Sequence, residues 1–216
     1  MTPERFHRLR AALARRQPDL TVLMDLVHKS HNFSAILRSC DAVGVLEAHV
    51  VATEDAVAIH HATSAGTKKW VAVRRHANVA EAIGHLRGRG FTILAAHPSA
   101  DAVDYREVDY TRPTTLTLGA ELRGVSAEAL ALADVHITIP MVGLVHSLNV
   151  SVAAGLVLFE AFRQRSAASM YEQTRLPADE FAARLFEWAY PSLARRRREV
   201  GRAYPPLGPN GELLPD

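Results

Sequence analysis

Ser147 and Asn149 lie where a strand, a loop and a helix could together bind a ligand. The β-branched run at 137–139 predicts a strand that Pro140 ends, and the apolar stretch 150–159 predicts a helix. Either polar side chain can cap that helix by accepting a free backbone N–H of its first turn. Such N–H groups can also hold a nucleotide or another anion, because ligands of open α/β sheets lie beyond the carboxyl ends of strands. A buried core helix with an ordinary serine cap gives the same pattern, so both interpretations stay open.

Arg38 is a second candidate for chemistry, in the segment 28–44. Asn32 or Ser34 can cap a helix here, and Gly44 is its expected C-terminal glycine. Arg38 follows Asn32 by six residues, which places the cation near the start of the helix, where the helix dipole disfavours it. A cation in that position can serve to bind an anion. From spacing alone, an arginine that extends into solvent is the simpler explanation.

The composition predicts one globular domain with short arms. The chain has 216 residues, of which 48% are apolar and 22% charged, an ordinary balance for a folded domain of this length. The single Cys40 excludes an internal disulfide and a cysteine-based zinc site, and it fits a reducing cytoplasm. No apolar signal core begins the chain, and no uncharged apolar run reaches the ~20 residues of a membrane span. We therefore expect a cytoplasmic protein with no membrane segment.

Positive charge is concentrated at the two ends of the chain. Residues 1–16 hold five arginines and one acid, residues 163–216 hold nine arginines and seven acids, and residues 17–162 have a net charge of −4. Basic arms around a slightly acidic body suggest that the arms meet a polyanion. A pair of solvated amphipathic helices would give the same distribution of charge.

Strands alternate with helices six times within residues 20–165, which predicts a mostly parallel α/β sheet with helices on both faces. The expected strands are 20–27, 48–51, 70–73, 91–96, 114–118 and 136–139. Asn78 and Ser126 are expected helix caps. Periodicity alone predicts a Rossmann-like domain without a knot. A nicotinamide enzyme is disfavoured, because the glycine fingerprint and its acidic ribose partner are missing.

We expect three parts: a basic N-terminal helix at 1–18, the α/β domain at 19–166 and a basic helical arm at 167–216. Amphipathic patterns predict the helix of the first part at 3–16 and one helix of the last part at 178–190. The adjacent pair His60 and His61 points apart along the chain, so we expect no joint metal site there.

Three stretches resemble the motifs of the SpoU/TrmH branch of the SPOUT RNA methyltransferases, in the order in which that family has them. They are NFSAILR at 32–38, GAELRGVS at 119–126 and IPMVGLVHSLNVSVAAGLVLFEA at 139–161. The resemblance covers essentially the whole chain. It implies a deep trefoil knot in the C-terminal part of the α/β domain, whose loops hold S-adenosylmethionine in a bent form. It also implies a homodimer that packs knot against knot, with no obligate protein partner.

The resemblance implies methyl transfer from S-adenosylmethionine to the 2'-hydroxyl of an RNA ribose, and the nearest subgroup acts on guanosine-18 in the D-loop of tRNA. Arg38 is then the catalytic arginine that serves the pocket of the other subunit, and Asn32 orients it. Ser147 and Asn149 hold the ribose or the cofactor, and Glu121 bonds the nucleoside or an arginine. No metal is expected to take part. A ribosomal RNA ribose methyltransferase and a non-catalytic RNA-binding knot protein are the alternatives.

Two further sets of residues follow from the resemblance and from the charge pattern. Backbone groups of five residues are expected to bind the adenosine part of the cofactor: Ala96, Gly119, Ile139, Met141 and Leu148. Six cations are expected to contact RNA: Arg8, Arg15, Arg16, Lys68, Arg196 and Arg197. The sequence departs from the family in having His146 where a glutamine is usual and Ala96 where a threonine is common. His97 could act as a base near neutral pH, although the resemblance gives it no catalytic role.

Overall fold

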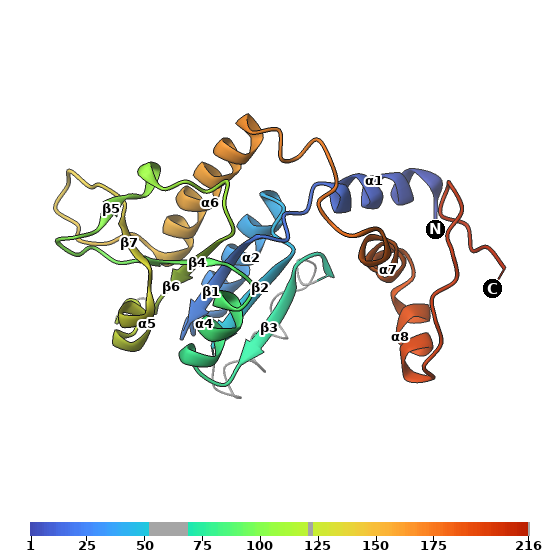
Figure 1. The fold of residues 1–216 in the computed structure, drawn as a ribbon, viewed down its shortest axis with the longest axis horizontal. Coiled ribbons are helices and arrows are strands. Elements are labelled where there is room, and N and C mark those ends of the chain that lie inside the picture. The colour runs from blue at the N-terminus through green and yellow to red at the C-terminus, as the bar shows by residue number, and fades with distance from the viewer. Residues whose placement is uncertain (52–68, 121–122, 216) are drawn as a thin grey trace. The chain divides into compact units, whose positions relative to one another are not determined.

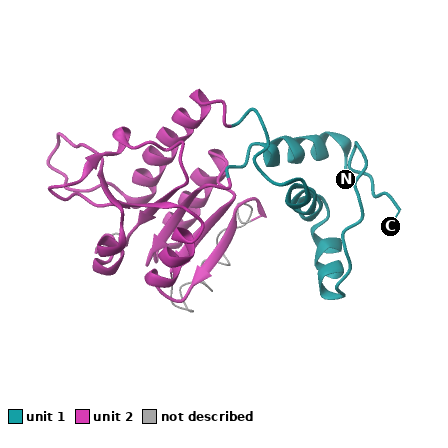
Figure 2. Ribbon diagram, viewed as in Figure 1, with its two compact units in different colours: residues 1–17, 171–216 teal, residues 18–170 magenta. Residues whose placement is uncertain are grey.

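The computed structural model in Figure 1 describes residues 1–51, 69–120 and 123–215. The chain forms two compact units, residues 1–17 with 171–216 and residues 18–170 (Figure 2). The two terminal arms, which the sequence pattern treats as separate parts, therefore join in one unit. The observed boundaries lie within four residues of the expected ones.

Residues 18–170 contain a seven-stranded sheet in which every pair of neighbouring strands is parallel (Figure 1). The order across the sheet is β3-β2-β1-β6-β4-β7-β5. The strands are β1 (Leu20–Asp25), β2 (Glu47–Val51), β3 (Ala72–His76), β4 (Thr92–Ala96), β5 (Val103–Asp104), β6 (Thr114–Leu118) and β7 (Val135–Thr138). The expected parallel sheet is confirmed. The trefoil knot within it stays a prediction.

Side chains alternate between the two faces of the sheet, as the pleat of a strand requires. On β1, Val22 and Met24 belong to a core shared with helices α2 (Ser30–Ala42) and α6 (Val150–Ala167), whereas Leu23 belongs to a core shared with α4 and α5. Helix α4 spans Val79–Arg87 and α5 spans Ala127–Leu132; a short 3-10 helix, η2, spans Tyr105–Glu107. Helices thus cover both faces, as expected.

The expected helix caps hold for α4 and α5 and fail for α2. Asn78 accepts a hydrogen bond from the Glu81 N–H at 2.8 Å, and Ser126 accepts one from the Ala129 N–H at 3.2 Å. Helix α2 instead begins at Ser30 after Lys29, which makes no side-chain cap bond. The prediction that Asn32 or Ser34 caps it is wrong, because both residues lie inside the first two turns.

The earlier start of α2 changes the position of Arg38. This arginine is the ninth residue of α2, so it lies in the third turn and the unfavourable end of the helix dipole does not reach it. The argument from the helix start is therefore wrong for Arg38. The expected strand at 70–73 is also displaced, since β3 begins at Ala72 and Trp70 lies in a turn.

The smaller unit is built from α1 (Pro3–Ala14), α7 (Ala178–Ala189) and α8 (Pro191–Glu199). Its α1 packs on α7 and its α7 on α8. Arg16 is buried in this unit, with its guanidinium carbon 5.2 Å from the centre of the Trp188 ring. The expectation that Arg16 contacts RNA is therefore wrong, because a buried guanidinium stacked on an indole presents no charge to a polyanion. Arg8, Arg15 and Arg196 are exposed.

Among the described helices, none combines the length and the apolar character that crossing a bilayer would need.

Arg165, near the end of α6, is fully buried and joins three parts of the larger unit. Its Nη1 donates to the Asp19 carboxylate at 2.6 Å, and its Nη2 donates to the Asp19 carbonyl at 3.1 Å. Its Nε donates to the Tyr110 carbonyl at 2.8 Å, and Nη2 also reaches the Arg112 carbonyl at 3.0 Å. These bonds tie α6 to the residues that lead into β1 and β6.

Arg165→Met should destabilise the protein by about 3 kcal/mol, because it removes the buried cation that pairs with the Asp19 carboxylate and donates to the Tyr110 carbonyl. We expect Tm to fall by roughly 5–10 °C in a thermal melt followed by circular dichroism. Arg163→Met is the matched control. Its guanidinium is exposed and pairs with Glu160 within the same helix, so its Tm should stay near that of the parent chain. Equal melts for the two variants would contradict the role of Arg165.

Candidate active site

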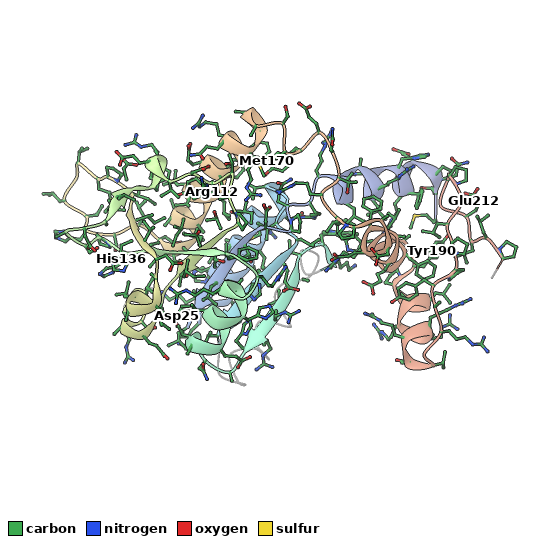
Figure 3. All side chains as sticks on the ribbon, in the orientation of Figure 1. Asp25, Arg112, His136, Met170, Tyr190 and Glu212 are labelled. Atoms are coloured by element: carbon green, nitrogen blue, oxygen red, sulfur yellow. The ribbon has the colours of Figure 1, made fainter. Side chains whose placement is uncertain are left out.

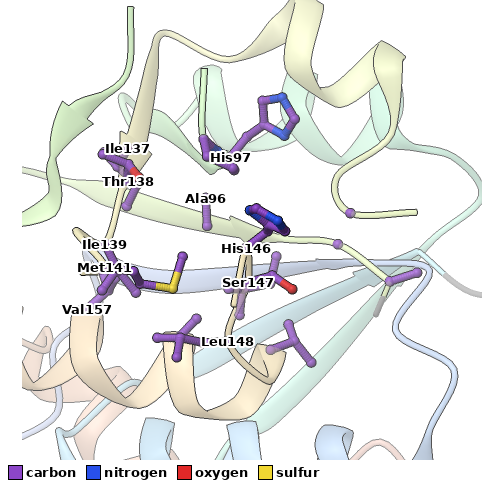
Figure 4. Close-up of a pocket in the computed structure, with 17 residues that line it drawn as sticks. Ala96, His97, Ile137, Thr138, Ile139, Met141, His146, Ser147, Leu148 and Val157 are labelled. Atoms are coloured by element: carbon purple, nitrogen blue, oxygen red, sulfur yellow. The ribbon is translucent and has the colours of Figure 1, made fainter. Parts of the chain in front are cut away.

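A cavity of about 160 Å³ lies at the carboxyl ends of β4, β6 and β7 and reaches the start of α6 (Figure 4). This is the edge of a parallel sheet where ligands are expected. All five residues expected to bind the cofactor line this cavity: Ala96, Gly119, Ile139, Met141 and Leu148. The structure therefore brings them together from three strand ends and one loop, although their role in binding stays a prediction.

The cavity has an apolar floor and an exposed side that carries the polar side chains of His146 and Ser147. Buried Leu118, Ile137 and Val157 form part of the floor. The loop that carries His146 and Ser147 is exposed and closes the cavity from the α6 side (Figure 4). An apolar surface with a few polar groups suits a flat ring system whose edges make hydrogen bonds.

Asn149, and not Ser147, caps α6. The Asn149 Oδ1 accepts from the Ser151 N–H at 2.8 Å and from the Ser151 hydroxyl at 2.6 Å. Ser147 lies two residues before this cap, in the loop, and lines the cavity. The sequence allowed either residue as the cap, and the structure shows Asn149 in this role. The Ser147 side chain lies where its hydroxyl can bond a ligand.

Gly119 cannot carry a side chain. A Cβ atom at this position would lie 2.0 Å from the backbone carbonyl group of Gly124 and 2.1 Å from the Val125 nitrogen. The Gly124 N–H donates to the Ala120 carbonyl at 2.7 Å, and Gly124 has a φ of +66°. The space beside Gly119 is therefore filled by its own turn, and this turn forms one wall of the cavity.

Asp25 lies at the end of β1 (Figure 3) and holds the end of that turn at Ser126. It is buried, and its Oδ2 accepts from the Ser126 N–H at 2.8 Å. Because Met24 of β1 pairs with Leu118 of β6, the carboxylate lies next to the strand end from which the turn begins. Sequence reasoning missed Asp25; the signal was a lone acid that ends an apolar strand.

His136 on β7 helps to fix the loop that follows β4. Its Nε2 lies 3.1 Å from the Leu130 carbonyl, which only accepts, so this nitrogen carries the proton, and its Nδ1 lies 3.2 Å from the Ser99 hydroxyl oxygen. The hydrogen bond from Ser99 is the main cause that lowers the pKa of Asp101 below its ordinary value. The His97 N–H donates to the Ile137 carbonyl at 3.0 Å, which anchors the rim of the cavity.

Asn32 and Asn149, which lie 117 residues apart, meet in the structure. The Asn149 Nδ2 donates to the Oδ1 of buried Asn32 at 3.2 Å, so the start of α2 is joined to the start of α6. Arg38 lies about 9 Å further along α2 and about 120° around it, from the geometry of an α-helix. It is exposed and does not line the cavity of its own chain.

Two of the candidate residues, Glu121 and Lys68, lie outside the described residues, as does the pair His60 and His61. Arg197 is partly buried and its Nη1 donates to the Ala203 carbonyl at 2.9 Å. The four arginines at 195–198 are therefore not equivalent. Arg198 lies 3.3 Å from Glu187, whereas Arg196 is exposed.

Comparison with known proteins connects this geometry to one family. The model of the SpoU rRNA Methylase family matches residues 19–159, and that of the SpoU rRNA methylase C-terminal region matches 163–216. A tRNA (guanosine(18)-2'-O)-methyltransferase of Escherichia coli (strain K12) is 50% identical over 218 residues, covering 100% of this chain and 95% of that protein. The crystal structure of the A. aeolicus TrmH/SpoU tRNA modifying enzyme matches with a TM-score of 0.81 and 45% identity, over 88% of this chain and 97% of that one. An AdoMet-bound rRNA methyltransferase from Sinorhizobium meliloti matches with a TM-score of 0.61 and 31% identity, over 72% and 59%.

Asp25→Ala should loosen the turn after β6. Removing the acceptor of the Ser126 N–H should raise the hydrogen-exchange rate of that amide about tenfold, the value of one hydrogen bond to a charged group. Asp25→Asn keeps an acceptor oxygen and should change the rate much less. Amide exchange measured by NMR on both variants tests this. Equal protection of Ser126 in Asp25→Ala and in the parent chain would show that the carboxylate does not hold the turn.

Proposed function

Because the chain belongs to the SpoU family of RNA methyltransferases, we propose that it methylates the ribose 2'-hydroxyl of guanosine-18 in tRNA, with S-adenosylmethionine as methyl donor. One observation carries the choice of tRNA over ribosomal RNA. The likeness to the tRNA (guanosine(18)-2'-O)-methyltransferase of Escherichia coli runs through the smaller unit to the end of the chain. The likeness to the rRNA methyltransferase of Sinorhizobium meliloti covers only 72% of the chain.

The residues of the cavity fit S-adenosylmethionine. Apolar Leu118, Ile137 and Val157 offer surface to an adenine ring, and the backbone near Met141 and Leu148 offers hydrogen-bonding groups. When bound, this cofactor supplies a methyl group already activated by its sulfonium. A cavity of about 160 Å³ is smaller than the ~300 Å³ of common ligand sites. We therefore expect the exposed loop at 141–147 to move outward on binding.

Arg38 is our candidate for activating the ribose hydroxyl. A guanidinium stays protonated in proteins, so Arg38 does not act as a simple base. It would hold an RNA phosphate beside the hydroxyl and favour the alkoxide electrostatically, while the phosphate or water takes the proton. Asn32 stands apart from Arg38 and bonds Asn149. We therefore assign Asn32 to the positioning of α6 and not of Arg38.

A homodimer would bring Arg38 to a cavity. Four apolar side chains of α6 are exposed in the single chain: Val152, Leu156, Phe159 and Phe162. Phe159 and Phe162 lie with ring centres 6.2 Å apart, and such a patch on a helix marks an association surface. Helix α6 packs on α2, which carries Arg38. Association through α6 would thus place the arginine of one chain near the other chain.

The smaller unit would bind the body of the tRNA. Exposed Arg8, Arg15 and Arg196 are suited to phosphate contact, because the guanidinium makes bidentate bonds to oxyanions. A tRNA substrate implies a cytoplasmic site of action, in agreement with the single free Cys40.

Arg38→Ala should lower the rate of methyl transfer by about 100-fold or more and leave cofactor affinity unchanged, because Arg38 does not line the cavity. Labelled S-adenosylmethionine and an unmodified tRNA transcript give the rate, nuclease mapping locates the label, and calorimetry gives the affinity. Arg112→Ala is the control, since Arg112 is exposed at the amino end of β6. Label found only on ribosomal RNA, or no transfer to any RNA, would contradict the proposal.

Co-expression of Arg38→Ala with Gly119→Ala extends this experiment to the proposed sharing of the site. A mixed dimer would hold one complete site, formed by the intact cavity of one chain and Arg38 of the other. A statistical mixture of dimers should then regain about a quarter of the parent activity. If each chain used its own arginine, the mixture would stay inactive.

Phe159→Asp should produce monomers and remove methyl transfer, because the substitution places a charge in the middle of the apolar patch of α6. Light scattering coupled to gel filtration measures the mass. Val200→Asp is the control, an exposed apolar residue of the smaller unit. A Phe159→Asp variant that keeps the parent mass would exclude the patch as the dimer interface.

A further inference from the structure

Three histidines and two glutamates gather on the α4 face of the sheet, at the edge formed by β2 and β3. Glu47 and His49 belong to β2, His76 to β3, and Glu81 and His85 to α4. The three imidazole rings lie with centres 5.1 to 5.7 Å apart. None of these residues lines the cavity at β4, β6 and β7, so the methyl-transfer reaction does not account for them.

The hydrogen bonds fix which nitrogens carry protons. Backbone donation from Ala77 lowers the pKa of Glu81, so its carboxylate accepts, and His76 Nδ1 must donate to it across 3.3 Å. In the neutral ring, His76 Nε2 is then an acceptor, and His49 Nδ1 donates to it at 2.8 Å. His49 Nε2 is consequently left with a bare lone pair.

That lone pair faces other acceptors. His49 Nε2 lies 3.5 Å from Glu47 Oε1, and ligand atoms of Glu47, His49 and His85 all lie within 4.8 Å of one another. His85 Nε2 is buried, and within the described parts of the chain no group bonds it. Three electron-pair donors therefore converge on one small space at this edge of the sheet.

We propose that Glu47, His49 and His85 bind one divalent transition-metal ion, with zinc the best fit. Two imidazoles and a carboxylate are a common zinc donor set that leaves a fourth position for water. The relay from His49 through His76 to Glu81 is the support that metal-bound histidines usually have. Ligands about 2.1 Å from zinc lie about 3.4 Å apart in a tetrahedron. The three side chains therefore need to draw together by about 1 Å.

Two arginines compete with the ion for Glu47. Arg74 Nε donates to Glu47 Oε1 at 3.0 Å, and Arg89 Nη1 lies 3.8 Å from the same oxygen. Their side chains are 49% and 42% exposed, so both can turn into solvent when an ion binds. Their charge opposes a cation, and removing one of them should strengthen binding. An ion bound here would join β2 to α4 at this edge of the sheet.

The test uses the full chain without a histidine tag, stripped with a chelator and titrated with zinc by calorimetry and with Co²⁺ by absorption spectroscopy. One ion per chain is expected, with d–d bands typical of nitrogen and oxygen ligands. His85→Ala should lose this binding and Arg74→Gln should tighten it. His76→Gln should weaken it about 10- to 100-fold, and His7→Ala, an exposed histidine elsewhere, should keep it.

Thermal melts of each variant with and without zinc separate a loss of metal binding from a loss of folding, because each variant is compared with itself. Zinc should raise the Tm of the parent chain and of His7→Ala by mass action, and leave His85→Ala unchanged, while Mg²⁺ should affect none of them. Absence of Co²⁺ bands in the parent chain, or equal zinc binding by the parent and His85→Ala, would overturn the proposal. Neither result bears on the methyl-transfer assay, which tests the proposed function separately.

Discussion

The buried guanidinium of Arg165 is the interaction on which the larger unit depends most. A charge without access to water is tolerated only if its donors are satisfied, and here its partners are the Asp19 carboxylate and the carbonyls of Asp19, Tyr110 and Arg112. These groups precede β1 and β6, the two central neighbours in the sheet. The end of α6 is thereby held to the amino ends of the strands whose carboxyl ends lie near the cavity.

Helix α6 carries this constraint to the site. It has 18 residues and is therefore about 27 Å long, with Arg165 near one end and the Asn149 cap at the other. The bond from Asn149 to buried Asn32 holds the second end against α2. With both ends fixed, the helix start that borders the cavity has little freedom, which is what an alignment of methyl donor and ribose demands. Asn149 thus combines a cap with a contact between helices.

The sequence predicted the features that depend on residues close together in the chain. The apolar run at 20–27 located β1, and the caps Asn78 and Ser126 followed from residue type. The resemblance brought together the residues that line the cavity, because a family motif carries three-dimensional information that periodicity lacks. The expected cap at Asn32 was wrong, because α2 begins at Ser30, and the role of Asn32 toward Arg38 stays a prediction.

What could not be predicted depends on partners far apart in the chain. Arg165 looks like one more charge at a polar helix end, since its acceptors are mostly carbonyls, which every residue has. Asp25 has its partner 101 residues away, at Ser126. The group of Glu47, His49 and His85 becomes visible only when β2 and α4 are packed, because no spacing of the usual metal motifs links these residues.

Helix α6 has apolar side chains on its buried side and on its exposed side. One side packs on the sheet, and the other is suited to association. Ala154, Val157 and Leu158 are buried against the sheet, whereas Val152, Leu156 and Phe159 on the same helix are 40–51% exposed. An ordinary surface helix would place charges at the second set. Apolar residues there reduce the solubility of the single chain, so they indicate a surface that is covered in the working protein. Helix α6 also borders the cavity. A partner that packs on its outer face would therefore affect the site through this rigid helix. Assembly and catalysis would then be coupled without any movement of the sheet.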